Sequence, residues 1–281
     1  MAVPFQIRAW LLTLAGASVL FGQADALQII RRAIAADERN WKVARHYAYS
    51  ERVVVRYVDD QGSLKSQEVS LRDVMLLDGS PYRRLVELND RPLSVAHEKK
   101  EQRKLARSIA ERQRESATLR AERLAEYASR PEWQREAWQD LPVAFDFRLV
   151  SEEIWDGRRM YVIHASPRQD YQPRSLTGKV LARLRAILWV DEQDYHIAKA
   201  EAEVIDTIAV GLFLVRVTKG SRATLEQARM NDEVWLPRQV RTFASARLGL
   251  LKVLRVEQEI TYSKCRVVQA ALPAMSRVQA K

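Results

Sequence analysis

The hydrophobic and polar residues between positions 187 and 204 follow the pattern of a β-hairpin. The stretch reads ILWVDEQDYHIAKAEAEV, so an apolar run leads into the polar cluster Asp191–Asp194, and strict alternation follows. A period of two is typical of a strand with one buried face, and a short polar break favours a tight turn. The alternation predicts two faces for the second strand, with Ile197, Lys199, Glu201 and Glu203 on one and Ala198, Ala200, Ala202 and Val204 on the other.

Similar patterns before and after this hairpin predict a meandering antiparallel sheet of about 10–11 strands. Turn-forming pairs such as Asp156-Gly157 and Asn231-Asp232 separate neighbouring strands. Together with the helices described below, the pattern indicates an α+β protein. Besides the hairpin, strands are expected at 47–57, 64–77, 82–88, 144–154, 160–164, 208–217, 223–230, 234–246 and 250–262.

A helix is predicted over residues 27–44, before the first strand. Its apolar side chains recur at spacings of three, four and seven, which places them on one face. We expect this face to pack on the sheet, or to form part of the wall of a binding cavity. The residues concerned are Ile30, Ala33, Ile34, Trp41 and Ala44.

A second helical segment, residues 97–138, differs in composition from the rest of the chain. Lys, Arg, Glu and Ala dominate it, it lacks Gly, and Pro131 is the single proline between His97 and Glu136. This composition predicts one long charged helix, inserted between strands and broken near Pro131. Its apolar stripe is narrow, so we expect a solvated surface helix. The functional alternative is a mobile lid or docking arm over the sheet.

The two ends of the chain are expected to lie outside the folded domain. Arg8 precedes 13 uncharged residues, Ala9–Phe21, and the small residues of Ala24-Asp25-Ala26 follow. This layout predicts a secretory signal peptide, residues 1–26, cleaved after Ala26. The alternative is an uncleaved membrane anchor, although the run is shorter than the ~20 apolar residues that a spanning helix needs. We therefore expect a periplasmic protein with a single domain at 27–268 and a flexible tail at 269–281.

The net charge narrows the classes of partner. The formal net charge is +10, which indicates an evenly solvated basic surface, with acidic partners or transient contact with anionic lipid head groups at a membrane surface as the alternative. No nucleic-acid-recognition motif accompanies this charge, so we expect no nucleic-acid partner.

Cys265 is the only cysteine, which excludes an intramolecular disulfide. The fold must therefore be stabilised by its hydrophobic core, and 47% of the residues in the chain are apolar.

The sequence offers no catalytic signature. The four histidines have no partner at metal-ligand spacing, and no phosphate-binding glycine loop or nucleophile elbow is present. The carboxylate pairs Glu152-Glu153 and Asp191/Asp194 are explained by turns or solvent-facing positions. We therefore expect neither an enzyme, nor a cofactor, nor a metal site.

Two apolar runs, 208–217 and 248–256, exceed what one buried face of a strand requires. A strand that is apolar on both faces must be covered on both. Core packing explains any single residue of these runs, whereas the pair of runs favours an apolar ligand cavity. The residues expected to line it are Leu212, Phe213, Leu214, Leu250 and Leu254, with Trp189 near the mouth.

From about Tyr47 to Tyr262, the chain resembles the LolA/LolB-like superfamily and, more narrowly, outer-membrane lipoprotein-sorting-like exported proteins. The resemblance is one of pattern and short phrases. These are YRRLV at 82–86, FDFRL at 145–149, YQPRS at 171–175, the hairpin at 188–203 and NDEVWLP at 231–237.

The resemblance implies a strongly curved antiparallel sheet, an open half-barrel with capping helices, whose apolar concavity binds acyl chains of lipoproteins. It therefore implies periplasmic carriage or sensing of lipid or lipoprotein acyl chains in outer-membrane biogenesis. Two features depart from the family pattern: the large helical insertion, and the lack of a lipid-bearing cysteine near the predicted cleavage site. The alternative function is a non-transporting module of the same fold that binds another envelope protein through the sheet edge or the inserted helix.

Overall fold

An antiparallel sheet of 13 strands forms the body of the structure, a computed structural model that describes residues 12–210, 215–248 and 252–268. Eleven strands form a continuous path in the order β4-β3-β2-β1-β13-β12-β11-β8-β7-β6-β5, and β9 and β10 extend β12 at one end. The two edges, β4 and β5, do not pair with each other within the described residues, so the sheet stays open. The predicted α+β half-barrel is confirmed.

The strand bounds agree well with the alternating segments of the sequence. The two additional strands relative to the predicted 10–11 arise from very short elements, β4, β9 and β10, which contain two or three residues each. The strands are β1 Tyr47–Val58, β2 Leu64–Leu77, β3 Ser80–Leu88, β4 Arg91–Pro92, β5 Phe145–Trp155, β6 Arg158–Pro167, β7 Leu184–Asp191, β8 Ile197–Val204, β9 Ile208–Val210, β10 Val215–Val217, β11 Arg222–Met230, β12 Val234–Leu248 and β13 Lys252–Val267.

Tight turns join the hairpins at the predicted positions, with two residues between β5 and β6 and three between β11 and β12. Asp156 and Gly157 both have positive φ, 52° and 77°, and Asn231 and Asp232 have φ of 52° and 53°. Positive φ at both central residues is the type I′ arrangement, whose twist matches that of the flanking strands. Both predicted turns are therefore confirmed, and each places its two strands side by side.

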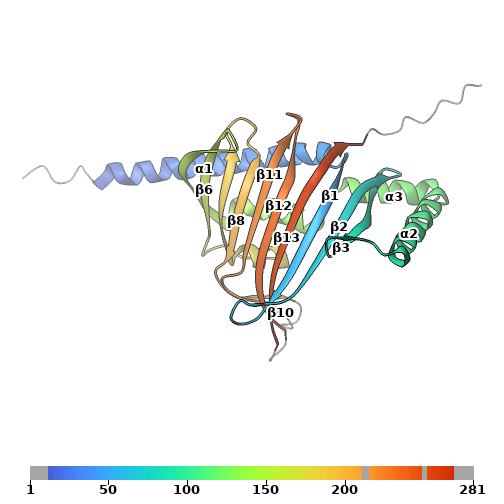
Figure 1. Ribbon diagram of the computed structural model, residues 1–281. Helices are drawn as coiled ribbons and strands as arrows, with labels where there is room; N and C mark the ends of the chain where they lie inside the picture. The colour runs from blue at the N-terminus through green and yellow to red at the C-terminus, as the bar shows by residue number, and fades with distance from the viewer. Residues whose placement is uncertain (1–11, 211–214, 249–251, 269–281) are drawn as a thin grey trace, which may run out of the picture.

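The helices lie against one face of the sheet or beyond its β3 edge (Figure 1). Helix α1 crosses the ends of the strands, and α2 and α3 stand beyond β3. No helix of the described residues is both long and apolar enough to cross a membrane. The helices are α1 Leu12–Ala44, α2 Val95–Gln113, α3 Ala117–Ala128, α4 Glu132–Ala144 and α5 Leu176–Leu181.

The predicted single helix at 97–138 is corrected to three helices. The break near Pro131 is confirmed, since Pro131 is the N-cap residue of α4. A second break was not predicted: Ser116 takes an extended backbone conformation, and its hydroxyl accepts a hydrogen bond from Leu119 N. A serine that caps a new helix satisfies an amide that the preceding helix would otherwise use, so the chain turns there.

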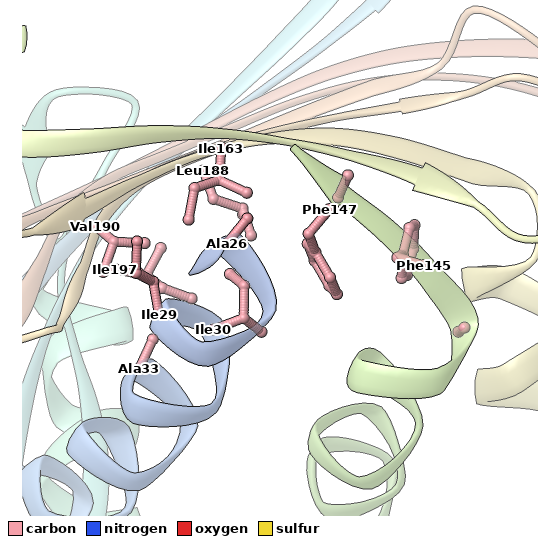
Figure 2. Close-up of a cluster of buried hydrophobic side chains, with 12 residues drawn as sticks. Ala26, Ile29, Ile30, Ala33, Phe145, Phe147, Ile163, Leu188, Val190 and Ile197 are labelled. Atoms are coloured by element: carbon pink, nitrogen blue, oxygen red, sulfur yellow. The ribbon is translucent and has the colours of Figure 1, made fainter. Parts of the chain in front are cut away.

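The main core lies between α1 and the face of the sheet that α1 and α4 cover, which we call the inner face (Figure 2). Ala26, Ile29, Ile30 and Ala33 repeat at helical spacing on α1, and they point to the strands. Ala26, the last residue of the predicted signal peptide, is fully buried in this cluster. The opposing side chains include Phe147, Ile163, Leu188, Val190 and Ile197.

The alternation predicted for β8 is interrupted at its start. Lys199 pairs with Trp189, yet Ile197 pairs with Val190, so Ala198 is an extra residue in the ladder. This bulge moves Ile197 to the inner face, together with Ala200, instead of the face that Lys199 occupies. The inner face therefore has one more large apolar side chain than the sequence pattern predicted.

Candidate functional site

A cavity of about 640 Å³ lies between the inner face of the sheet and helices α1 and α4. Its size falls within the ~300–1,000 Å³ typical of ligand pockets. The lining is dominated by apolar and aromatic side chains from both layers. The larger ones are Trp41, Trp133, Trp138 and Leu141 from the helices, and Phe145, Leu188, Ile197, Leu225, Trp235, Val240 and Tyr262 from the strands.

The floor of the cavity follows from cross-strand register. Leu188 pairs with Ala200, Ala200 with Leu225, and Leu225 with Val240, so one row crosses four strands on the same face. Ala186, two residues before Leu188, also lines the cavity. Because the alanines do not reach the helix layer, space remains above them while the larger side chains surround it.

The roof is formed by matching faces of two helices. Asp37, Trp41 and Ala44 lie three or four residues apart on α1, and this spacing turns them to the same side. On α4, Ala137 and Leu141 are spaced in the same way. Trp133, at the start of α4, is 60% exposed although it lines the cavity, so it lies where the cavity meets solvent.

A buried ion pair connects the two parts of the roof. Arg130, between α3 and α4, lies 2.6 Å from the Asp37 carboxylate and 3.0 Å from that of Glu38, and its guanidinium stacks over Trp41. The Arg130 side chain is only 8% exposed. Burial raises the pKa of Asp37 despite the opposing attraction of Arg130. The polar groups of this region thus hold α1 to the segment that leads into α4.

Asn40 fixes α1 to the start of β12. Its side-chain amide donates to Trp235 O and accepts from Trp235 N, both at 2.8 Å. Both residues also line a second, polar hollow of about 360 Å³ on the other side of this contact. The Asn40–Trp235 pair therefore separates an apolar cavity from a polar hollow.

His196 is buried beside this partition. Its ring stacks on Trp235, with centroids 5.3 Å apart, and only 2% of the residue is exposed. Neither ring nitrogen has a hydrogen-bond partner among the described residues. Burial lowers the pKa of His196 to about 4, so the imidazole is neutral at physiological pH.

The cavity ends at an aromatic pair on the β1–β13 side. Tyr49 and Tyr262 meet edge to face, with centroids 5.5 Å apart. Burial raises the pKa of Tyr262 to about 12, so its hydroxyl stays protonated and can donate a hydrogen bond. Tyr262 is among the polar residues that line the cavity, and a phenol can donate to a carbonyl or carboxylate oxygen of a ligand.

The structure places two of the predicted lining residues, and neither is among the residues that line the cavity. Trp189 follows Leu188 on β7 and so takes the opposite face, where Lys199 lies over its ring and Glu153 accepts from its indole. Leu254 lies on the same face of β13 as Tyr262, eight residues nearer the β12–β13 turn, and is half-buried. The other predicted residues, Leu212, Phe213, Leu214 and Leu250, lie outside the described residues.

Several lining residues were not predicted from the sequence. Trp133 and Trp138 belong to the segment 97–138 that was expected to be solvated, although two tryptophans within six residues are a recognisable apolar signal, and Leu141 follows that segment. Leu225 and Val240 belong to predicted strands, yet only the register shows that they meet. No group of His, Cys, Asp and Glu residues within the described ranges is arranged to hold a metal ion.

Comparison with known proteins gives matches of structure only. The sequence matches no family model, and no curated protein matches it. Among solved structures, an outer membrane lipoprotein-sorting protein domain from Vibrio parahaemolyticus aligns with a TM-score of 0.37 and 13% identity, over 90% of this chain and 95% of that one.

Two further structures match over similar lengths. A LolA superfamily protein from Nitrosomonas europaea aligns with a TM-score of 0.28 and 11% identity, over 87% of this chain and 94% of that one. A chain of the Pseudomonas aeruginosa MucA/MucB complex aligns with a TM-score of 0.25 and 13% identity, over 88% of this chain and 100% of that one. The similar structures thus include LolA-like proteins, and similarity of this degree assigns neither a family nor an activity.

Proposed function

We propose that the protein binds a lipid or a lipoprotein acyl chain in the cavity beneath α1 and α4, for carriage or sensing in the cell envelope. The observation that carries this proposal is the apolar cavity of about 640 Å³, enclosed by aromatic and aliphatic side chains from two layers. An acyl chain gains about 0.8 kcal/mol for each methylene group that leaves water. Roughly ten buried methylenes therefore supply enough free energy for useful affinity after the cost of association.

The polar groups around the cavity suit the head of such a ligand. Tyr262 offers a protonated hydroxyl at one end, and Trp133 marks the contact with solvent on the helix side. An acyl chain can lie along the row from Leu188 to Val240 while its ester or carboxyl group stays near the rim. The proposed site of action is the periplasm, in agreement with the signal peptide predicted at residues 1–26.

The test uses variants that fill the cavity. Ala137→Phe and Ala200→Phe each place a ring where the lining has only a methyl group, whereas Ala121→Phe, on the exposed side of α3, is the matched control. Binding of a fluorescent long-chain fatty acid is titrated for each purified variant, and circular dichroism confirms the fold. We expect wild type and the control to bind, and the two cavity variants to lose at least tenfold in affinity.

Native mass spectrometry of protein purified from a periplasm complements the titration. A bound lipid at one-to-one stoichiometry, absent from Ala200→Phe, would agree with the proposal. Lipid-free protein that also fails to bind the fatty-acid probe would overturn it. In that case the non-transporting module that binds another envelope protein becomes the better function.

A further inference from the structure

The cationic outer face of α2 is a surface that the cavity does not explain. Residues 91–130 contain eleven Lys and Arg against six Glu and no Asp, so they carry +5 of the formal net charge of +10. Figure 1 places α2 at the end of the molecule beyond β3, separate from the strands that form the floor of the cavity. The charge is therefore concentrated in one projecting part of the fold.

Two arginines of this segment, Arg112 and Arg123, attach the helices to the sheet. Arg112 donates to the carbonyl oxygens of Leu77, Ser80 and Pro81 in the β2–β3 turn. Arg123 pairs with Asp78 at 2.8 Å. Because these arginines are bound to the body of the protein, the insertion has a fixed orientation.

Two of the three glutamates of α2, Glu98 and Glu101, face β3, whereas Glu111 lies beside Arg107. Glu98 pairs with Arg84 of β3, and Glu101 is buried, where it accepts from Leu85 N. Five basic residues fall within an arc of roughly 100° on the other side of the helix, at about 100° per residue. They are Lys99, Lys100, Arg103, Arg107 and Arg114. We call these five residues the α2 cationic stripe.

The stripe is exposed and largely uncompensated. Lys99, Lys100, Arg103 and Arg114 are exposed and form no ion pair with any described residue, and Arg107 pairs only with Glu111, in a solvated contact. From Lys99 to Arg114 the stripe extends for roughly 22 Å at ~1.5 Å per residue. Val95, 74% exposed, lies at one border of the arc and adds an apolar contact at the first turn of α2.

We propose that the α2 cationic stripe docks the protein on an anionic lipid surface. Clusters of four to eight Lys and Arg on one helix face favour membranes that carry acidic head groups. The lysines of the stripe are flexible point charges, which suit a plane of mobile head groups, and an exposed apolar residue beside them can reach the interface. This surface lies apart from the cavity, so the inference does not depend on the proposed acyl-chain binding.

The experiment is vesicle co-sedimentation with the full chain. Vesicles of phosphatidylglycerol and phosphatidylcholine are compared with vesicles of phosphatidylcholine alone. Wild type should bind the anionic vesicles more tightly, and the preference should weaken as salt is raised from roughly 0.05 M to 0.5 M, because screening shortens the electrostatic range. At about fivefold for each cation near the surface, Lys99→Gln/Lys100→Gln/Arg103→Gln should reduce anionic-vesicle binding roughly a hundredfold.

The matched control removes the same charge elsewhere. Lys65, Arg174 and Lys179 are exposed and form no ion pair with any described residue, and the variant Lys65→Gln/Arg174→Gln/Lys179→Gln should bind as wild type does. Equal losses in both triple variants, or equal binding of wild type to the two kinds of vesicle, would overturn the proposal. Soluble poly-glutamate provides a further arm: binding to it in place of vesicles would indicate an acidic protein partner and would also overturn the proposal.

The two proposals of function are separable in the same samples. The stripe variant should keep its affinity for the fatty-acid probe, and Ala137→Phe should keep its preference for anionic vesicles. A stripe variant that loses both activities and its circular dichroism spectrum has unfolded, and single substitutions at Lys99 or Lys100 then replace it. Each single variant should lower binding about fivefold, and an unchanged affinity would count against the stripe.

Discussion

Arg130 and Asp37 form an ion pair, 2.6 Å apart, that joins the segment between α3 and α4 to α1 at the edge of the cavity. Replacing Arg130 by Ala leaves the Asp37 carboxylate buried without its partner. We expect a loss of about 2 kcal/mol in the free energy of unfolding, below the ~3–5 kcal/mol of a fully buried pair because Asp37 keeps some exposure. Urea unfolding at pH 7 measures this loss.

A double-mutant cycle separates the pair from the rest of Arg130. Asp37→Asn removes the buried charge, so Arg130→Ala should cost less in that background than in wild type. Glu38 is the control, because its side chain is 57% exposed and Glu38→Gln should change stability by less than about 0.5 kcal/mol. Equal costs of Arg130→Ala in both backgrounds would show that the ion pair contributes nothing.

The amide of Asn40 satisfies both backbone groups of Trp235. Asn40→Ala leaves a part-buried N–H and C=O unpaired, which should lower stability by roughly 2 kcal/mol. For a protein of this size we expect a fall in Tm of about 4–8 °C, measured by differential scanning calorimetry. Asn40→Asp keeps the acceptor and should lose less than Asn40→Ala, whereas Gln169→Ala, at an exposed position, should have little effect.

Arg112 binds three carbonyl oxygens of the β2–β3 turn, so it should control how firmly α2 is attached. In Arg112→Ala we expect amide hydrogen exchange in α2 and α3 to accelerate about tenfold, since hydrogen bonds from a charged donor are lost. Arg112→Lys should restore little, because an ammonium lacks the planar fork that reaches several carbonyls. Arg103→Ala, on the exposed face of α2, should leave exchange unchanged, and a similar acceleration there would contradict this role for Arg112.

Local sequence patterns predicted the elements of the fold well and their breaks less well. Period-two alternation and turn pairs such as Asp156-Gly157 depend on neighbouring residues, so the strands and hairpins could be recognised. The pairing of β1 with β13 joins the first and the last strand of the chain, about 200 residues apart in sequence, and alternation alone does not identify such partners. The helix break at Ser116 and the bulge at Ala198 each depend on one residue whose neighbours fit the longer element equally well.

The candidate site was harder to predict than the fold. The sequence indicated an apolar cavity, but its lining depends on register and on which helix lies over the sheet. Leu188, Leu225 and Val240 come together because the strands align them in one row with Ala200, and continuous apolar runs were a poorer guide. Trp189 shows the difference plainly, since it adjoins Leu188 in sequence and faces the other way.

The lowered pKa of His196 predicts how the free energy of unfolding depends on pH. Its pKa is about 4 in the folded protein against 6.5 for an unperturbed imidazole, so below pH 6.5 the unfolded chain binds a proton that the folded protein does not. Stability should therefore fall as pH decreases from about 6.5 towards 4, by roughly 2 kcal/mol between pH 6.5 and 5. In His196→Leu this contribution is absent, so the loss of stability between pH 7.5 and 5 should be smaller by that amount.

Urea unfolding of wild type and His196→Leu at pH 7.5 and pH 5 measures the difference. At pH 7.5 the two proteins should be similar, because leucine fills much of the same space and removes two ring nitrogens that have no partner among the described residues. Asp37 has a raised pKa and contributes with the opposite sign at lower pH, and comparison of the two proteins cancels it. His46→Gln, at an exposed imidazole, serves as the control, and a pH dependence in His196→Leu as steep as that of wild type would contradict a buried neutral His196.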